Sequence, residues 1–323
     1  MDLEPEELQF LTIPQVLVES ISITKRSPRS FYLITLTLIF PLSLAILAHS
    51  LFTHPIIVKL DSVDSYNSAR ARHDWTVLLV IQFCYLIFLF AFSLLSTAAA
   101  VFTVASLYTA SPVSFSSTIY AIPKVFKRLF ITFLWIALLM FAYNAVFFLF
   151  LVMLLIAIDM NMLGLAIFAG LVISLLYFGV HVYITALWHL GSVVSVLEPI
   201  YGYAAMKKGY ELLKGRTQMG MVLVFVYLIL CTLIGGVFRS VVVHGGENHG
   251  IWTRIVIGGS LVGVLVIVNL VGLLIQSVFY YVCKSYHRES IDKTALHDHL
   301  GGYLGEYVPL KSNIQMENLN AAA

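Results

Sequence analysis

Residues Leu129 to Ile158 read LFITFLWIALLMFAYNAVFFLFLVMLLIAI and contain no charged side chain. A helix needs about 20 apolar residues to cross the roughly 30 Å of hydrocarbon in a bilayer. This stretch is longer than that, so it predicts a helix that spans a membrane. Five further stretches have the same character, and they run from Phe31 to Phe52, Trp75 to Tyr108, Leu163 to Leu197, Met219 to Val242 and Ile255 to Cys283.

These six spans define the expected architecture. We predict an all-α, polytopic membrane protein with six transmembrane helices, both termini in the cytosol and short interfacial helices. Residues 1–30 would form a cytosolic N-terminal segment, residues 31–283 the transmembrane domain and residues 284–323 a cytosolic tail. The expected location is the endoplasmic reticulum or another part of the endomembrane system, or the plasma membrane.

The composition agrees with this class of protein. Hydrophobic residues make up 60% of the chain and charged residues only 11%, whereas about a quarter of the residues in a soluble domain are charged. The formal net charge is +2 and the bases are spread over several loops, so we expect no binding of nucleic acid. Cys84, Cys231 and Cys283 fall within or at the end of spans, and this placement predicts no disulfide framework.

The distribution of basic residues predicts the orientation of the chain. Lysine and arginine are enriched in the loops of membrane proteins that face the cytosol. Most of the 19 bases lie before the first span, after the last span, or in the connections after the second and fourth spans. The other side would carry only Lys59, Arg70, Arg72, Arg239 and Arg254. Both termini are therefore expected in the cytosol.

A short helix is expected just before the first span. Thr12 is suited to cap such a helix, and Pro14 lies in its first turn. Its apolar surface would come from Val16, Val18, Ile21 and Ile23. We expect these side chains in the headgroup boundary and the following bases near anionic lipid. A loosely ordered tail is the alternative.

Two of the spans are followed by similar sequences. Tyr120-Ala-Ile-Pro-Lys124 precedes the third span, and Tyr203-Ala-Ala-Met-Lys207 precedes the fifth, 83 residues later. This similarity suggests an internal repeat of span, basic connector and span, with the two units parallel in the membrane as in some transporters. Chance convergence of basic loops beside the membrane is the alternative.

The connector LEPIYGYAAMKKGYELLKGR, from Leu197 to Arg216, resembles a motif of bacterial membrane proteins. Similar segments occur in the membrane domain attached to some glycerophosphodiester phosphodiesterases and in the YciC-like inner-membrane proteins. The resemblance implies a membrane-domain architecture and no catalytic residues, because the chain contains no phosphodiesterase barrel.

The whole chain resembles a plant family of polytopic membrane proteins. The resemblance rests on the connector and on YVCKSYH from Tyr281 to His287, SIDK from Ser290 to Lys293 and HLGGYLGEYVPLK from His299 to Lys311. Some members of that family are labelled polyadenylate-binding protein 1-B-binding protein. The resemblance implies a multi-pass membrane protein without an assigned activity.

A few polar residues within the spans form a candidate intramembrane site. His181 lies near the middle of the fourth stretch, with His189 two turns further along the same helix face. Asn269 and Gln276 share a face of the sixth span. Glu198 lies at the cytosolic mouth of the fourth span. These side chains could relay protons, bind a ligand or line a pathway. The alternative is hydrogen bonds that hold helices together, or for Glu198 a helix-end anchor or structural ion pair.

Two further kinds of site are expected at the cytosolic face. Contacts with lipid headgroups are candidates for Lys124, Lys127, Arg128, Lys207, Lys208, Lys214 and Arg216. Cys283, at the end of the last span, is a candidate for acylation, with an ordinary buried thiol as the alternative. The sequence contains no phosphate-binding loop, nucleophile elbow or zinc-protease motif. We therefore expect no catalytic residue, no cofactor and no metal site.

These features predict a non-enzymatic membrane protein. It would organise lipids or protein partners through its cytosolic connectors and tail. The alternative is a carrier of small molecules or lipids, with a polar pathway between the two repeats. A wide polar cavity that reaches His181 would favour the carrier, whereas a bundle packed shut around serine and glycine faces would favour the organising role.

Overall fold

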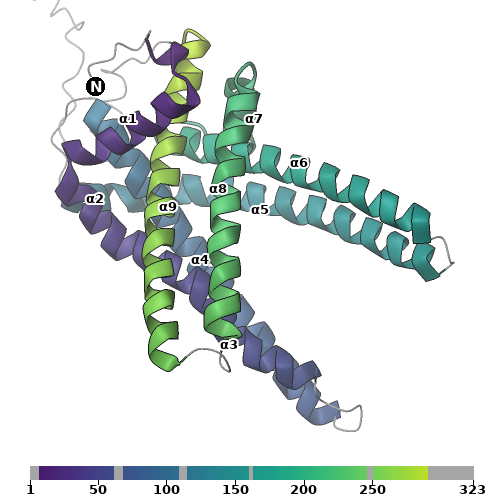
Figure 1. Ribbon diagram of the computed structural model, residues 1–323. Coiled ribbons are helices and arrows are strands. Elements are labelled where there is room, and N and C mark those ends of the chain that lie inside the picture. The colour runs from purple at the N-terminus through teal and green to yellow at the C-terminus, as the bar shows by residue number, and fades with distance from the viewer. Residues whose placement is uncertain (1–6, 62–67, 109–114, 160–162, 246–249, 290–323) are drawn as a thin grey trace, which may run out of the picture.

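The computed structural model describes residues 7–61, 68–108, 115–159, 163–245 and 250–289, all in helices or short turns (Figure 1). No strand occurs among these residues. The elements in chain order are η1 (Glu7–Phe10), α1 (Ile13–Arg26), α2 (Pro28–Ile34), η2 (Thr35–Ile39), α3 (Phe40–Asp61), α4 (Ser68–Tyr108), α5 (Phe115–Asp159), α6 (Leu163–Leu197), α7 (Tyr203–Leu213), α8 (Thr217–Phe238), η3 (Arg239–Val243) and α9 (Ile251–Tyr286).

Six candidate spans confirm the number predicted from the sequence. By length and composition they are Pro28–Leu60, Arg72–Tyr108, Val125–Ile156, Ile167–Leu197, Thr217–Val243 and Ile251–Tyr286. The first combines α2, η2 and α3, and the fifth combines α8 and η3. The longest helix, α5, has 45 residues and is therefore about 68 Å long at 1.5 Å per residue. It is too long to lie upright within about 30 Å of hydrocarbon, so it must tilt or protrude.

The spans form three helical hairpins, α3 with α4, α5 with α6, and α8 with α9 (Figure 1). The hairpins converge at the end of the molecule that carries α1 and α7. From there the α5–α6 hairpin runs sideways, whereas α3–α4 and α8–α9 run toward the bottom of the view. The distal half of the α5–α6 hairpin is consequently separated from the other two hairpins, whereas α3 still contacts η3 near the distal end of α8, where the rings of His54 and His244 lie 4.5 Å apart. We refer to the converging end as the connector end and to the opposite halves of the hairpins as the distal halves.

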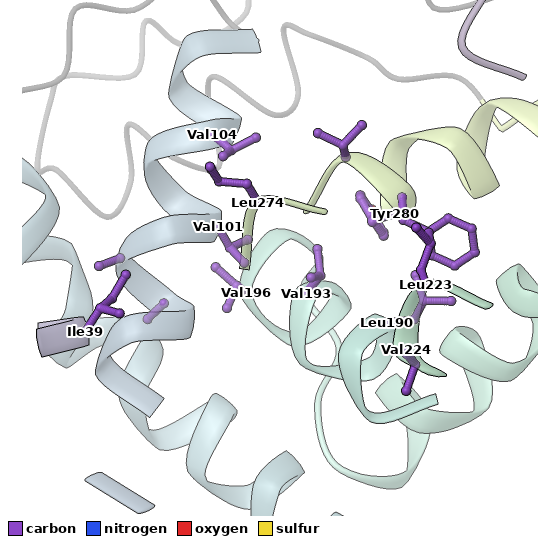
Figure 2. Close-up of a cluster of buried hydrophobic side chains, with 14 of the residues drawn as sticks. Ile39, Val101, Val104, Leu190, Val193, Val196, Leu223, Val224, Leu274 and Tyr280 are labelled. Atoms are coloured by element: carbon purple, nitrogen blue, oxygen red, sulfur yellow. The ribbon is translucent and has the colours of Figure 1, made fainter. Parts of the chain in front are cut away.

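The hydrophobic core lies where the hairpins converge. Figure 2 shows buried side chains of α4, α6, α8 and α9 meeting there, among them Val101, Val193, Val224 and Leu274. The distal half of α5 is different, because none of the residues in its most apolar window is buried. Most apolar side chains in the distal half of the α5–α6 hairpin are exposed, as expected for helices surrounded by lipid.

The N-terminal helix predicted before the first span is present as α1. The backbone N–H of Thr12 donates to Gln15 Oε1 over 2.8 Å, which closes its first turn. Val16 and Ile23 are buried because α1 packs against α9, whereas Val18 and Ile21 are exposed. The helix therefore divides its apolar surface between the protein and the surroundings, instead of presenting all four side chains to headgroups.

Glycines allow α7 to fold back against α6. Gly202 has a φ of +65°, a left-handed conformation that favours glycine, and its N–H donates to Thr132 Oγ1 over 2.8 Å. A Cβ added at Gly209 would lie only 3.0 Å from the backbone nitrogen of Gly191 on α6. The two helices thus approach each other through their backbones.

The two similar connectors have different structures. Tyr120–Lys124 lies inside the continuous helix α5, whereas Tyr203–Lys207 begins the separate helix α7. The sequence similarity between them therefore does not correspond to matched elements in these segments.

Candidate functional site

All six spans contribute side chains to one cavity with a volume of about 230 Å³. It is lined by Leu42, Ser93, Ser96, Thr97, Phe133, Met140, His181, Thr185, Trp188, His189, Ser192, Tyr227, Leu228, Asn269, Gly272, Leu273 and Gln276. Four of the five residues predicted to form an intramembrane polar site, His181, His189, Asn269 and Gln276, are thus brought together. None of the described residues that line the cavity is Asp, Glu, Lys or Arg.

His189 and Gln276 form the polar contact between α6 and α9. His189 Nδ1 lies 2.5 Å from Gln276 Oε1. Because an amide oxygen only accepts hydrogen bonds, Nδ1 is the donor, and a neutral His189 then has its acceptor at Nε2. The amide nitrogen of Gln276 is buried and has no hydrogen-bond partner within the described part of the chain. Gln276 therefore uses only half of its amide inside the protein.

Asn269 uses both ends of its amide to hold helices together. Its Oδ1 accepts from Tyr227 on α8 over 2.9 Å, and its Nδ2 donates to Ser43 Oγ on α3 over 2.9 Å. Asn269 and Ser43 are both buried. The geometry matches the interhelical hydrogen bonding that was one of the two roles expected for this residue.

His181 links α6 to α5. Its Nδ1 is hydrogen bonded to the hydroxyl of Tyr143. One turn toward the distal end, Tyr177 OH donates to Asn144 Oδ1 over 2.9 Å, and the Tyr177 ring stacks on Phe147. These contacts join the two helices of the hairpin at the point where His181 reaches the cavity.

Glu198 lies apart from the cavity, beyond the end of α6. Its Oε1 accepts from Tyr280 OH over 2.6 Å and from Lys284 Nζ over 3.2 Å, and both partners belong to α9. Its backbone carbonyl accepts from Arg128 of α5. Glu198 therefore joins three helices at the connector end, which fits the ion pair expected as one of its two possible roles.

The basic residues of the connectors fall into two groups. Three of them are used inside the protein, because Arg128 bonds to the carbonyl of Glu198, Lys208 pairs with Glu289, and Arg216 donates to the carbonyl of Gln9. The candidates with exposed side chains are Lys127, Lys207 and Lys214. The side chain of Lys124 lies outside the described part of the structure. Of the seven residues predicted to contact lipid headgroups, the three exposed lysines have side chains that are free to do so.

Cys283 is fully buried, with 0% of its surface exposed. It is therefore inaccessible to an acylating enzyme in this conformation, and its environment fits the alternative of an ordinary buried thiol. No group of three or more histidine, cysteine or acidic side chains placed to hold a metal ion occurs in the described residues.

Several cavity residues were not identified from the sequence as part of a site. Ser96 and Thr97 were interpretable only as small residues that permit close packing, and Trp188, Ser192 and Tyr227 gave no signal. They come from helices whose rotation about their own axes depends on tertiary packing. A hydroxyl at Ser93, Ser96 and Thr97 on one face of α4 was the single available hint.

Comparison with known families gives one result. A family model described as "Domain of unknown function (DUF8558)" matches residues 1–319. The chain belongs to this family. No curated protein and no solved structure matches it. The DUF8558 match includes all six spans, so the cavity and the connector lie within the matched residues.

Proposed function

We propose that the protein is a carrier that binds a small molecule in the middle of the membrane and moves it across. The observation that carries this proposal is the cavity, which is lined by all six spans, contains polar side chains within a mostly apolar wall and reaches His181. His181 and Asn269 lie near the middles of α6 and α9. Secondary transporters bind their substrates at this depth, at the interface between their moving parts.

The shape of the molecule supports a carrier with access from one side at a time. At the connector end the hairpins pack together, and Glu198, Tyr280 and Lys284 join α6 to α9 on the connector side of the cavity. The distal half of the α5–α6 hairpin is separated from the other two hairpins (Figure 1). This arrangement corresponds to a carrier that is closed at the connector end and open toward the distal side.

The orientation and the membrane are part of the proposal. The connector end would face the cytosol, because the lysines and arginines of the chain are concentrated there. Lys127, Lys207 and Lys214 would then contact anionic headgroups, and the membrane would be the endoplasmic reticulum or the plasma membrane. The resemblance to a plant membrane family is consistent with either location.

A non-enzymatic role in organising lipids or protein partners is the second candidate. It is favoured by the exposed lysines of the connector end and by the outward-facing apolar side chains of the distal halves. Both candidates are non-enzymatic. The cavity adds to the first candidate a feature that an organising protein does not need.

The test of the carrier uses purified protein in sealed proteoliposomes. Uptake of a panel of radiolabelled metabolites and lipids is measured with and without a pH gradient, for the unmodified protein and for His181→Ala. We expect uptake of at least one solute by the unmodified protein and a loss of that uptake in the variant.

His49→Ala is the matched control for this experiment. His49 also forms an interhelical hydrogen bond, with Gln82 over 2.9 Å, but it lies outside the cavity. It should retain uptake. Folded protein that moves no solute, or uptake that is equal in all three proteins, would overturn the carrier proposal and direct attention to partners of the connector end.

A further inference from the structure

Two buried polar groups in the cavity have no partner within the described part of the chain. They are Ser96 Oγ on α4 and Gln276 Nε2 on α9. Ser96 is 1% exposed and Gln276 is 5% exposed. A buried polar group without a hydrogen bond costs free energy, and native proteins rarely leave one unmatched. Two such groups that line the same cavity from different helices indicate that a bound molecule completes their hydrogen bonds.

Several of the other polar groups that line the cavity are already engaged. Thr185 Oγ1 donates to the carbonyl of His181 over 2.8 Å, and Ser192 Oγ donates to the carbonyl of His189 over 2.9 Å. Tyr227 OH is bonded to Asn269. The fully buried groups left for a ligand are therefore those of Ser96 and Gln276, and the Nε2 acceptor of a neutral His189 also lies in the lining. Because an amide nitrogen only donates, the ligand must present an acceptor to Gln276.

The charge of the lining restricts the ligand further. No Asp, Glu, Lys or Arg side chain is among the described residues that line the cavity, and its two histidines are His181 and His189. The ion pair of Glu198 with Lys284 lies outside it and is neutral as a pair. A charged ligand would lose its hydration at the middle of the membrane without an opposite charge to replace it. A neutral molecule meets no such obstacle.

The volume sets the size. About 230 Å³ is smaller than the roughly 300 Å³ at which pockets for drug-sized ligands begin. We propose that this cavity binds a small, uncharged polar molecule whose hydroxyl or carbonyl oxygen accepts a hydrogen bond from the amide of Gln276, with Ser96 as its second contact. The inference rests on the proposed carrier for the movement of this molecule, but binding itself does not depend on transport.

The experiment compares solutes that have the same size and differ in charge. The pairs are urea with guanidinium, acetamide with acetate, and glycerol with glycerate. Binding is measured by ligand-induced thermal stabilisation of protein in nanodiscs, and movement by stopped-flow light scattering of proteoliposomes against protein-free vesicles. We expect the neutral member of at least one pair to bind and to be moved about tenfold faster than its charged partner.

Variants assign the effect to the cavity. Gln276→Leu should weaken binding about tenfold or more, because it removes a hydrogen bond from a buried site. Gln82→Leu is its matched control, since Gln82 also pairs with a histidine across two helices but lies outside the cavity. It should bind as the unmodified protein does. Ser96→Ala removes a single oxygen atom and serves as the second variant if Gln276→Leu does not fold.

The outcomes separate this inference from the proposed function. Movement of a charged solute that depends on Gln276 would overturn the inference and leave the carrier standing. A neutral solute that binds through Gln276 and is not moved would support the inference and overturn the carrier. Absence of binding by every solute of the panel, or binding that Gln276→Leu and Ser96→Ala both leave unchanged, would overturn the inference.

Discussion

Asn269 joins α9 to both α8 and α3 through the two ends of its amide. Hydrogen bonds between membrane helices contribute about 0.6 kcal/mol on average and up to about 1.7 kcal/mol. A double-mutant cycle with Tyr227→Phe and Asn269→Leu should therefore give a coupling free energy of about 0.6–1.7 kcal/mol. The measurement is reversible unfolding in mixed micelles, followed by tryptophan fluorescence.

Asn144 supplies the control for this cycle. It accepts a hydrogen bond from Tyr177 over 2.9 Å in the distal half of the α5–α6 hairpin, where Asn144 is exposed and Tyr177 is half-buried. The cycle of Tyr177→Phe with Asn144→Leu should give the smaller coupling. Equal values for the two pairs would contradict the view that burial at the centre of the bundle strengthens the contact of Asn269.

The candidate site shows how far single residues could be predicted from the sequence. His181 with His189, and Asn269 with Gln276, share helix faces by their spacing, and each pair lines the cavity as a pair. Glu198 was grouped with them because it is ionisable, but it lies six residues beyond Ser192, the last cavity residue of α6, and pairs with Lys284. Tyr227 and Trp188 could not be predicted as cavity residues, since an aromatic residue in a span can face either lipid or a neighbouring helix.

At the scale of elements, α7 is held against α6 by the close approach of Gly209 to Gly191. A larger side chain at position 209 would meet backbone atoms, which cannot rotate away. Gly209→Leu should therefore displace α7 and destabilise the protein by about 1–3 kcal/mol, the usual cost of overpacking a tight contact. The thermal unfolding midpoint in detergent is the measurement.

Ala204→Leu adds a similar side chain to the exposed face of the same helix. Its effect should stay within about 0.5 kcal/mol, as for most surface substitutions. A midpoint for Gly209→Leu that equals that of Ala204→Leu would show that α7 does not need the contact with Gly191.

The elements were predictable to different degrees. The six spans and α1 follow from apolar length and from the cap at Thr12, which are local properties of the chain. The internal repeat was inferred from five residues in each connector, and the structure gives those residues different settings in α5 and α7. The difference arises after Gly202, whose positive φ starts a new helix, and the first connector has no glycine at the corresponding position.

For the whole molecule, the six spans and the contact of Gln9 with Arg216 place both ends of the described chain at the connector end. If that end is cytosolic, engineered Asn-x-Thr acceptors should be glycosylated in microsomes when placed within 62–67 or 246–249. Acceptors placed within 300–320 should stay unmodified. Modification of the last group with protection of the first two would show the opposite orientation.

The separation of the α5–α6 hairpin from the other two hairpins predicts that its distal half moves relative to them (Figure 1). The core lies where the hairpins converge and continues between α3, α8 and α9, whereas no residue in the most apolar window of α5 is buried. Segments with few packed contacts open at low free-energy cost. Pairs of spin labels can be introduced in a cysteine-free background, with one label on the first span, formed by α2, η2 and α3, and the other on α5. The pair at Tyr32 and Phe130, at the connector end, should therefore give a narrow distance distribution. Phe52 with Phe148 should give a broad one in the distal halves.

All four labelled positions are exposed, so the labels themselves disturb little packing. The distributions are measured by double electron–electron resonance in nanodiscs, without added solute. A carrier must exchange a state open on the distal side for one closed there, and that exchange widens only the distal pair. Equal widths for the two pairs would mean that the hairpins are held rigidly along their whole length, and a rigid bundle of this shape could bind a molecule at its cavity without carrying it across.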